Sequence, residues 1–226
     1  MTLERGGAVA ALVCAGTYLF GFALLTTILA PLSYGTNDID PHAVVAFIGR
    51  KPGVLTMWNT AIYIVNALAL VVLVVALSAH LEASNRQWAC VCQAFGLIWA
   101  TLVLGAGMIA NTAVEVAAAG VAVNATQTVQ TWAILHAVEL GLGGGNEIAG
   151  GAWVMCVSLA GGTGHGINRM ARYAGIVTGV AGLVTIIPMY GRFAGEVFGL
   201  GAIIWFVAVA WGLFRSMNGT RFQSIM

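Results

Sequence analysis

The sequence predicts an all-α membrane protein with six transmembrane helices joined by short loops. Of its 226 residues, 60% are hydrophobic and only 8% are charged, whereas soluble domains carry about 25% charged residues. Six apolar segments are each long enough to cross about 30 Å of hydrocarbon at about 1.5 Å per residue. They lie near residues 8–31, 55–79, 89–113, 128–160, 170–188 and 194–214.

The loops predict a single domain, 1–226, with both termini in the cytoplasm. No linker, low-complexity tract or charged run divides the chain, and an even number of spans places the termini on one side. That side carries six basic residues, namely Arg5, Arg86, Arg169, Arg172, Arg215 and Arg221, and the other side three, namely Arg50, Lys51 and Arg192. The positive-inside rule then gives cytoplasmic termini. The net charge of +1 offers no basic surface for nucleic acid.

The first outer loop, residues 32–54, contains turn residues and one short apolar patch, AVVAFI. Because this patch is too short to span a bilayer, we expect a small helix on the outer surface. It should start after Asp40 with Pro41 as its first residue, since proline suits the first turn of a helix. The loop could serve as a lid or as a docking surface.

The fourth segment is too long for one simple span. A continuous helix over 128–160 would measure about 50 Å, well beyond the hydrocarbon thickness. Glycine weakens helix interiors, and the segment holds a cluster of them at Gly141, Gly143, Gly144 and Gly145. The cluster predicts either a functional break or close helix packing, because Gly141 and Gly145 also form a GxxxG pattern.

Small residues recur in the last two spans. Gly175 and Gly179 are four residues apart in the fifth span, as are Gly195 and Gly199 in the sixth. In lipid, such pairs let helix backbones approach closely. With Gly182 added, we expect the last three spans to pack tightly together.

Polar residues gather in the second and fourth spans. If the fourth helix stays regular, its His136, Glu139 and Glu147 share one face. The predicted pocket for a ligand or ion consists of Glu147, Asn146, Asn66, Glu139, His136 and Asn59. Glu147 would lie near mid-depth, where an ionised carboxylate costs roughly 3 kcal/mol. A protonated carboxyl bonded to an asparagine, a bound cation, and a bond that only orients the helices would each offset this cost.

The sequence offers two further candidate sites around this pocket. Glu115, Glu196 and Arg192 fall near the outer surface and predict an outer vestibule. His136 and Glu139 form an HxxE pair, the reverse of the ExxH used by di-iron bundles. The other ligands of such a centre are missing, so a metal site at this pair is a minor alternative to hydrogen bonding.

The sequence favours a non-catalytic protein. It contains no GxSxG, HExxH or phosphate-binding loop. We expect an accessory or scaffolding subunit of a membrane complex, whose polar pocket binds lipid, quinone or another small ligand and whose partners are other membrane subunits or further copies of itself. One alternative is a carrier or channel for a cation, proton or polar solute that uses Glu147. Another is an intramembrane enzyme at His136 and Glu139.

The last two spans, RYAGIVTGVAGLVTIIP and GEVFGLGAIIWFVAVAWGLFRS, resemble the closing third of a bacterial family of six-helix membrane proteins catalogued only as a domain of unknown function. The residues that carry the likeness are Arg172, Gly175, Glu196, Trp205, Trp211 and Arg215. This resemblance implies six helices and a bacterial inner membrane. It implies no chemistry, because the family has no assigned activity.

Overall fold

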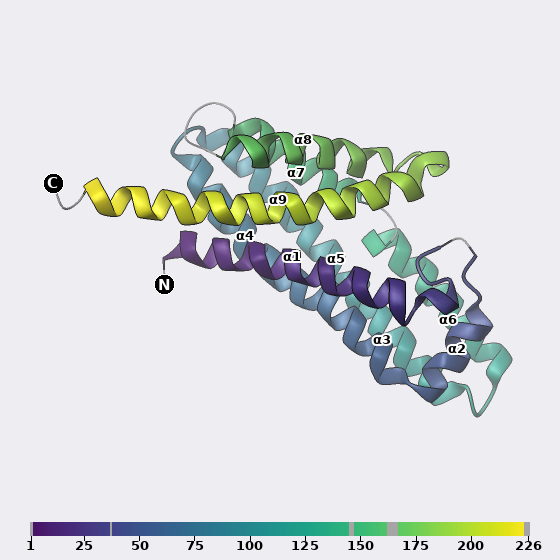
Figure 1. Ribbon diagram of the computed structural model, residues 1–226. Coiled ribbons are helices and arrows are strands. Elements are labelled where there is room, and N and C mark those ends of the chain that lie inside the picture. The colour runs from purple at the N-terminus through teal and green to yellow at the C-terminus, as the bar shows by residue number, and fades with distance from the viewer. Residues whose placement is uncertain (1, 37, 145–146, 162–166, 224–226) are drawn as a thin grey trace. The chain divides into compact units, whose positions relative to one another are not determined.

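The computed structural model describes residues 2–36, 38–144, 147–161 and 167–223 (Figure 1). Every regular element in these ranges is a helix, which confirms the all-α class. In chain order they are α1 (Leu3–Thr27), the 3-10 helix η1 (Ala30–Leu32), α2 (Pro41–Arg50), α3 (Pro52–Asn59), the π-helix η2 (Thr60–Val65), α4 (Asn66–Glu82), α5 (Arg86–Gly120), α6 (Ala125–Glu139), the π-helix η3 (Leu140–Gly144), α7 (Ile148–Ala160), α8 (Arg169–Val184) and α9 (Pro188–Gln223).

Four helices of the described chain are long and apolar enough to cross a membrane. They are Leu3–Thr27, Pro52–Glu82, Arg86–Gly120 and Pro188–Ser216. The second is a continuous run of α3, η2 and α4. Many of their large apolar side chains are exposed, Leu19, Leu68 and Ile98 among them, and such apolar surface is typical of membrane or protein contact.

The other two predicted spans are not single long helices. The segment 128–160 is divided into α6, η3 and α7, and Gly143 in η3 has a φ of 136°, outside the helical region. The prediction that His136, Glu139 and Glu147 share one face required a regular helix. Because the helix is broken at Gly143, the three residues do not lie on one regular helical face. The fifth predicted span, 170–188, corresponds to α8, whose 16 residues extend only about 24 Å.

The chain groups into two compact units. Unit 1 comprises Met1–Gly16, Leu68–Ala100 and Glu147–Met226, and unit 2 comprises Thr17–Ala67 and Thr101–Asn146. Because α1 and α5 are long, each contributes residues to both units. The predicted single domain is therefore made of two separately compact groups of contacts.

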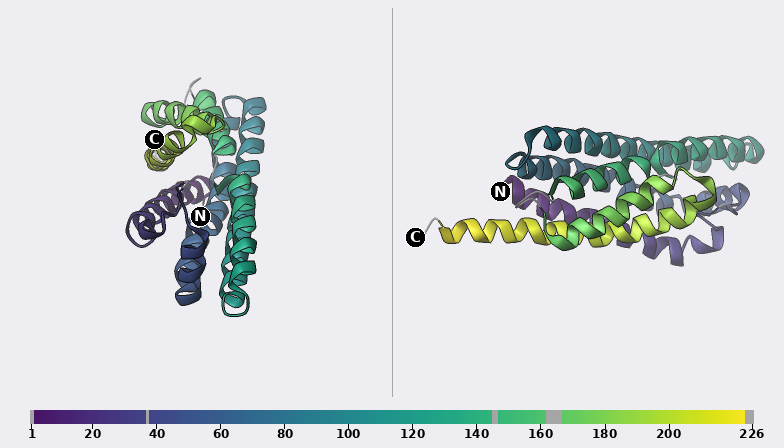
Figure 2. Two further views of the ribbon diagram at one scale, coloured as in Figure 1. Left: turned by 90° about the vertical axis from the view of Figure 1, so that its right-hand side faces the viewer. Right: turned by 90° about the horizontal axis from the view of Figure 1, so that it is seen from above.

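Glycines hold the helices of unit 1 close together. α7 packs against α8, and α8 against α9 (Figures 1 and 2). A Cβ atom on Gly151 would lie 2.8 Å from the carbonyl oxygen of Gly179, and one on Gly182 would lie 2.6 Å from the Cα atom of Gly151. The predicted close approach is thus confirmed at Gly179 and Gly182. It is wrong at Gly195, where a Cβ would meet no atom within 4 Å.

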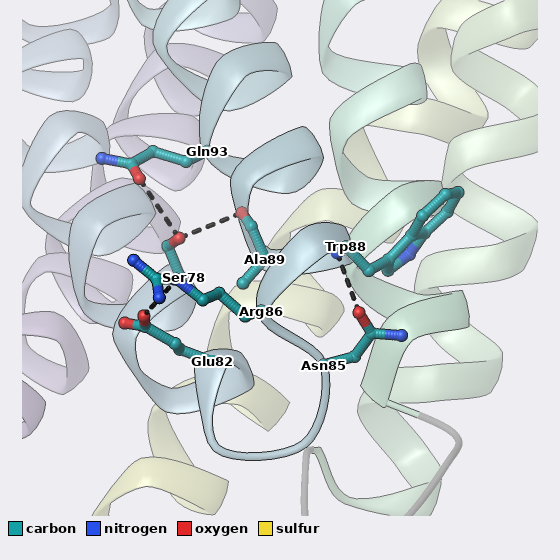
Figure 3. A network of polar contacts seen from close by, with 7 residues as sticks. All are labelled: Ser78, Glu82, Asn85, Arg86, Trp88, Ala89 and Gln93. Atoms are coloured by element: carbon teal, nitrogen blue, oxygen red, sulfur yellow. Dashed lines mark hydrogen bonds and ion pairs between the residues drawn. The ribbon is translucent and has the colours of Figure 1, made fainter.

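The turn between α4 and α5 in unit 1 is fixed by polar side chains (Figure 3). The Oδ1 atom of Asn85 accepts a hydrogen bond from the backbone N–H of Trp88 at 3.1 Å and so caps α5. The Ser78 hydroxyl donates to the carbonyl oxygen of Ala89 at 3.0 Å, which joins the two helices. The Trp88 indole then donates to the carbonyl oxygen of Cys156 at 3.1 Å, which fastens α7 to the start of α5.

In unit 2, α2 forms where the sequence predicted a small helix. It starts at Pro41, and the Asp40 side chain accepts a hydrogen bond from the His42 N–H at 2.9 Å. This confirms the predicted start. The helix packs against α6, and the buried face of α2 joins a core whose members are Leu29, Tyr34, Val44, Val45, Ile48, Leu55, Trp58, Ala113, Val114, Ala117 and Trp132.

Candidate functional site

Glu139 is the centre of a buried hydrogen-bonded cluster in unit 2. It is the last residue of α6 and is only 3% exposed. Its Oε1 atom accepts a hydrogen bond from the Tyr63 hydroxyl at 2.6 Å, and its Oε2 atom lies 2.7 Å from Nδ1 of His136. Both carboxylate oxygens are therefore engaged by side chains of the protein itself, as a buried carboxylate requires.

Two aromatic rings lie against the histidine of this cluster. The His136 ring stacks on Trp132, with centroids 4.8 Å apart and an interplanar angle of 19°. The centroid of the Tyr34 ring lies 5.7 Å from that of His136, with an interplanar angle of 47°. Burial, and to a smaller extent the charge of Glu139, raises the pKa of the Tyr34 phenol. The tautomer of His136 that carries hydrogen on Nδ1 can donate this hydrogen to the Glu139 carboxylate.

One π-helical turn and one helix break border the cluster. Tyr63 lies in the π-helix η2, and Glu139 immediately precedes η3, where the helix is broken at Gly143. π-helical turns are rare and often occur at functional sites. Gly107 of α5 lacks a Cβ at the place where one would collide with the Cβ of Tyr63. This close approach of α5 helps to set the position of the tyrosine.

The two predicted site residues of the second span, Asn59 and Asn66, lie in unit 2 and differ in their hydrogen bonding. The Asn66 amide, 1% exposed, donates to the hydroxyl of Thr17 at 2.7 Å. Asn59, also 1% exposed, has no hydrogen-bond partner in the described chain for either amide atom. The hydroxyl of the next residue, Thr60, accepts a hydrogen bond from the Asn111 amide at 3.1 Å. One of the two predicted asparagines is thus bonded within the fold, and the other has unused hydrogen-bonding capacity.

Glu147 belongs to unit 1, whereas His136, Glu139, Asn59 and Asn66 belong to unit 2. It is half-buried at the start of α7. Its backbone N–H donates to the Thr185 hydroxyl at 3.1 Å, but its carboxylate makes no hydrogen bond to any described residue.

Two other predicted residues lie outside the described ranges. They are Asn146 of the pocket and Gly145 of the helix break. The remaining glycines of the break, Gly141, Gly143 and Gly144, lie in η3, where the regular helix ends. The break therefore lies between Glu139, whose carboxylate is held by two side chains, and Glu147, whose carboxylate makes no hydrogen bond to a described residue.

The predicted outer vestibule is divided between the two units. Arg192 and Glu196 form an exposed ion pair of 3.3 Å in the first turns of α9, in unit 1. Glu115 is an exposed residue of α5 in unit 2. Of the three predicted vestibule residues, Arg192 and Glu196 thus contact each other within unit 1.

Three members of the buried cluster were not among the predicted site residues, namely Tyr63, Tyr34 and Trp132. Tyr63 had a usable signal, since it follows Asn59 by four residues and so lies on the same helical face. Tyr34 had none, because it lies in the loop after α1, whose path depends on tertiary packing.

No protein-family model, curated protein or solved structure matches this chain. The resemblance of the last two predicted spans to a bacterial family stays a prediction. In the described ranges, no group of three or more histidine, cysteine, aspartate or glutamate residues is placed to hold a metal ion. The chemistry open to the Glu139 cluster is hydrogen bonding and proton sharing among Tyr63, Glu139 and His136.

Proposed function

We propose that this chain is a non-catalytic integral membrane protein of the bacterial inner membrane, an accessory or scaffolding subunit that associates with other membrane proteins or with further copies of itself. The observation that carries the proposal is the bonding of Glu139. Glu139 and His136 form the only buried carboxylate–histidine pair of the described chain, and both carboxylate oxygens of Glu139 are bonded by side chains of the protein itself, Tyr63 and His136. Such a cluster fixes helix positions, which is what a scaffold needs.

The proposal includes six membrane crossings with both termini in the cytoplasm. Four long apolar helices supply four crossings. The remaining two would come from α6, η3 and α7 together and from α8, which is short enough to need a locally thinner bilayer. The six basic residues on the terminal side, against three on the other, support the orientation.

Native mass spectrometry from mild detergent tests the scaffold proposal. We expect a complex of fixed stoichiometry, either with other membrane subunits or with copies of this chain. Glu139→Gln should weaken the complex, because it loosens the cluster that positions the helices, while the exposed Glu115→Gln should leave it intact. A monomer without partners in several mild detergents would overturn the proposal. A reporter enzyme fused after the last residue tests the orientation. If the reporter is found on the outer side of the membrane, the C-terminus is not cytoplasmic and the proposed orientation is wrong.

A second candidate function, a carrier for a cation or proton, is favoured by Glu147. Its carboxylate makes no hydrogen bond to a described residue, and it follows directly on the helix break. Broken helices and intramembrane acids mark ion sites in many carriers. In proteoliposomes, Glu147→Gln should abolish H⁺, Na⁺ or K⁺ flux while Glu115→Gln should not. Equal flux in wild type and Glu147→Gln would exclude this function.

A further inference from the structure

The start of α8 lies against the last turns of α9 in unit 1. The Asn168 amide, which precedes α8, donates to the carbonyl oxygen of Ala208 at 2.6 Å, and a Cβ atom on Gly212 would lie 3.1 Å from Nδ2 of Asn168. Further along, a Cβ atom on Gly175 would lie 2.5 Å from Nε1 of Trp205. The two helices are therefore antiparallel, and these contacts define the face that each turns to the other, the α8–α9 seam (Figure 1).

Each helix contributes one arginine to the α8–α9 seam. Arg172 lies four residues after Asn168 and three before Gly175, so it is on the face of α8 that meets α9. Arg215 lies three residues after Gly212, so it continues the face of α9 that meets α8. Long side chains of a helix point back toward its N-terminus. Because the helices are antiparallel, the two arginine side chains extend toward each other along the seam.

Neither arginine is neutralised by an acid of the described chain. Arg172 is partly buried, and its Nε atom is buried without a hydrogen-bond partner, although buried polar atoms are normally bonded. Arg215 is exposed and takes part in none of the ion pairs among the described residues. Glu4 and Glu82, acids in other helices of unit 1, contact basic side chains of α4 and α5 instead. The seam therefore carries two cations with unused donors.

We propose that the α8–α9 seam binds the phosphate of an anionic phospholipid between Arg172 and Arg215. A guanidinium can donate two parallel hydrogen bonds to phosphate oxygens. Basic pockets between membrane helices are typical sites for anionic headgroups. The site belongs to unit 1, whereas the Glu139 cluster belongs to unit 2, and it does not depend on whether the chain is a scaffold or a carrier.

The residues next to the seam favour a lipid over a soluble anion. Arg215 lies at the end of Pro188–Ser216, a stretch long and apolar enough to cross a membrane. Trp211, four residues before it, and Tyr173, which follows Arg172, are each 63% exposed. Tryptophan and tyrosine are enriched where a membrane meets water. A phospholipid covers such rings with its acyl chains while its phosphate meets the arginines, which a soluble anion does not.

Native mass spectrometry of the full chain in detergent tests the site, with phosphatidylglycerol and phosphatidylcholine of the same acyl chains as probes. We expect the anionic lipid to bind about tenfold more tightly, and Arg172→Gln and Arg215→Gln each to weaken its binding about fivefold, as one basic residue near a headgroup contributes. Equal binding of the two lipids to wild type would overturn the proposal. Unchanged binding in Arg215→Gln would do so too, and this exposed position tests the site even if Arg172→Gln does not fold.

Arg86→Gln is the matched control. It removes an exposed arginine of the same unit whose charge is already paired with Glu82 at 3.3 Å, so phosphatidylglycerol binding should stay within about twofold of wild type. A loss as large as that in Arg215→Gln would show attraction by overall charge rather than a site, and would overturn the proposal. Inorganic phosphate is the competitor, and it should not displace the lipid at equal concentration. If it did, the ligand would be a soluble anion and the proposed lipid site would be wrong.

Discussion

The two units of this protein hold their helices together by different means. In unit 1, α7 and α8 meet through glycines, and the backbone of Gly151 lies against that of Gly179 and Gly182. In unit 2, α6 and η2 are joined through side chains, with Glu139 bonded to Tyr63. In lipid the hydrophobic effect does not draw helices together, so close packing and polar bonds take its place. Unit 1 should therefore be sensitive to added volume, and unit 2 to lost polar atoms.

The largest effect is expected from Glu139→Ala. The change leaves the Tyr63 hydroxyl and the His136 ring buried without their partner, which should lower the free energy of unfolding by about 3 kcal/mol. Unfolding followed by tryptophan fluorescence in detergent micelles measures it. Glu115→Ala, at an exposed site of the same unit, is the control and should change stability by less than about 0.5 kcal/mol. Equal effects of the two variants would refute the role of the cluster.

Gly151→Ala should produce the next largest effect. The new methyl group would lie 2.8 Å from the carbonyl oxygen of Gly179 and 2.8 Å from the backbone nitrogen of Leu183, so α7 and α8 must separate, at a cost of about 2 kcal/mol. Gly195→Ala in α9 is the control, since a Cβ there meets nothing within 4 Å. It should gain up to about 1 kcal/mol from helix propensity. A neutral Gly151→Ala would show that glycine packing does not hold unit 1.

The break between α6 and α7 offers a smaller effect with a built-in control. Gly143 has a φ of 136°, which a residue with a Cβ adopts only under strain, so Gly143→Ala should cost about 1 kcal/mol. Gly141→Ala lies in the same segment, where a Cβ meets nothing within 4 Å, and should be neutral or slightly stabilising. If both variants behave alike in the same unfolding measurement, the backbone at Gly143 is not held in this conformation.

The sequence was informative where a local rule decides the structure. Pro41 after Asp40 located the start of α2, because capping acts within a few residues. The glycine cluster predicted either a break or close packing, and the structure has a break at Gly143. The sequence could not assign Glu139 and Glu147 to different units, because that depends on how the chain continues after Gly143. Nor could it choose Tyr63 as the partner of Glu139, since the two residues are 76 positions apart in the chain.

The smallest effect is expected from Glu147→Gln, and it is the sharpest test of the difference between the two glutamates. The Glu147 carboxylate makes no hydrogen bond to a described residue, so the amide removes the cost of a poorly solvated charge and breaks no bond. The free energy of unfolding should stay within about 0.5 kcal/mol of wild type or rise slightly. Glu139→Gln, the same change eight residues earlier, should lower it, because the amide can no longer accept on both sides. If Glu147→Gln destabilised the protein as much as Glu139→Gln, Glu147 would have to be a bonded structural residue, and its place as a carrier's coupling acid would be lost.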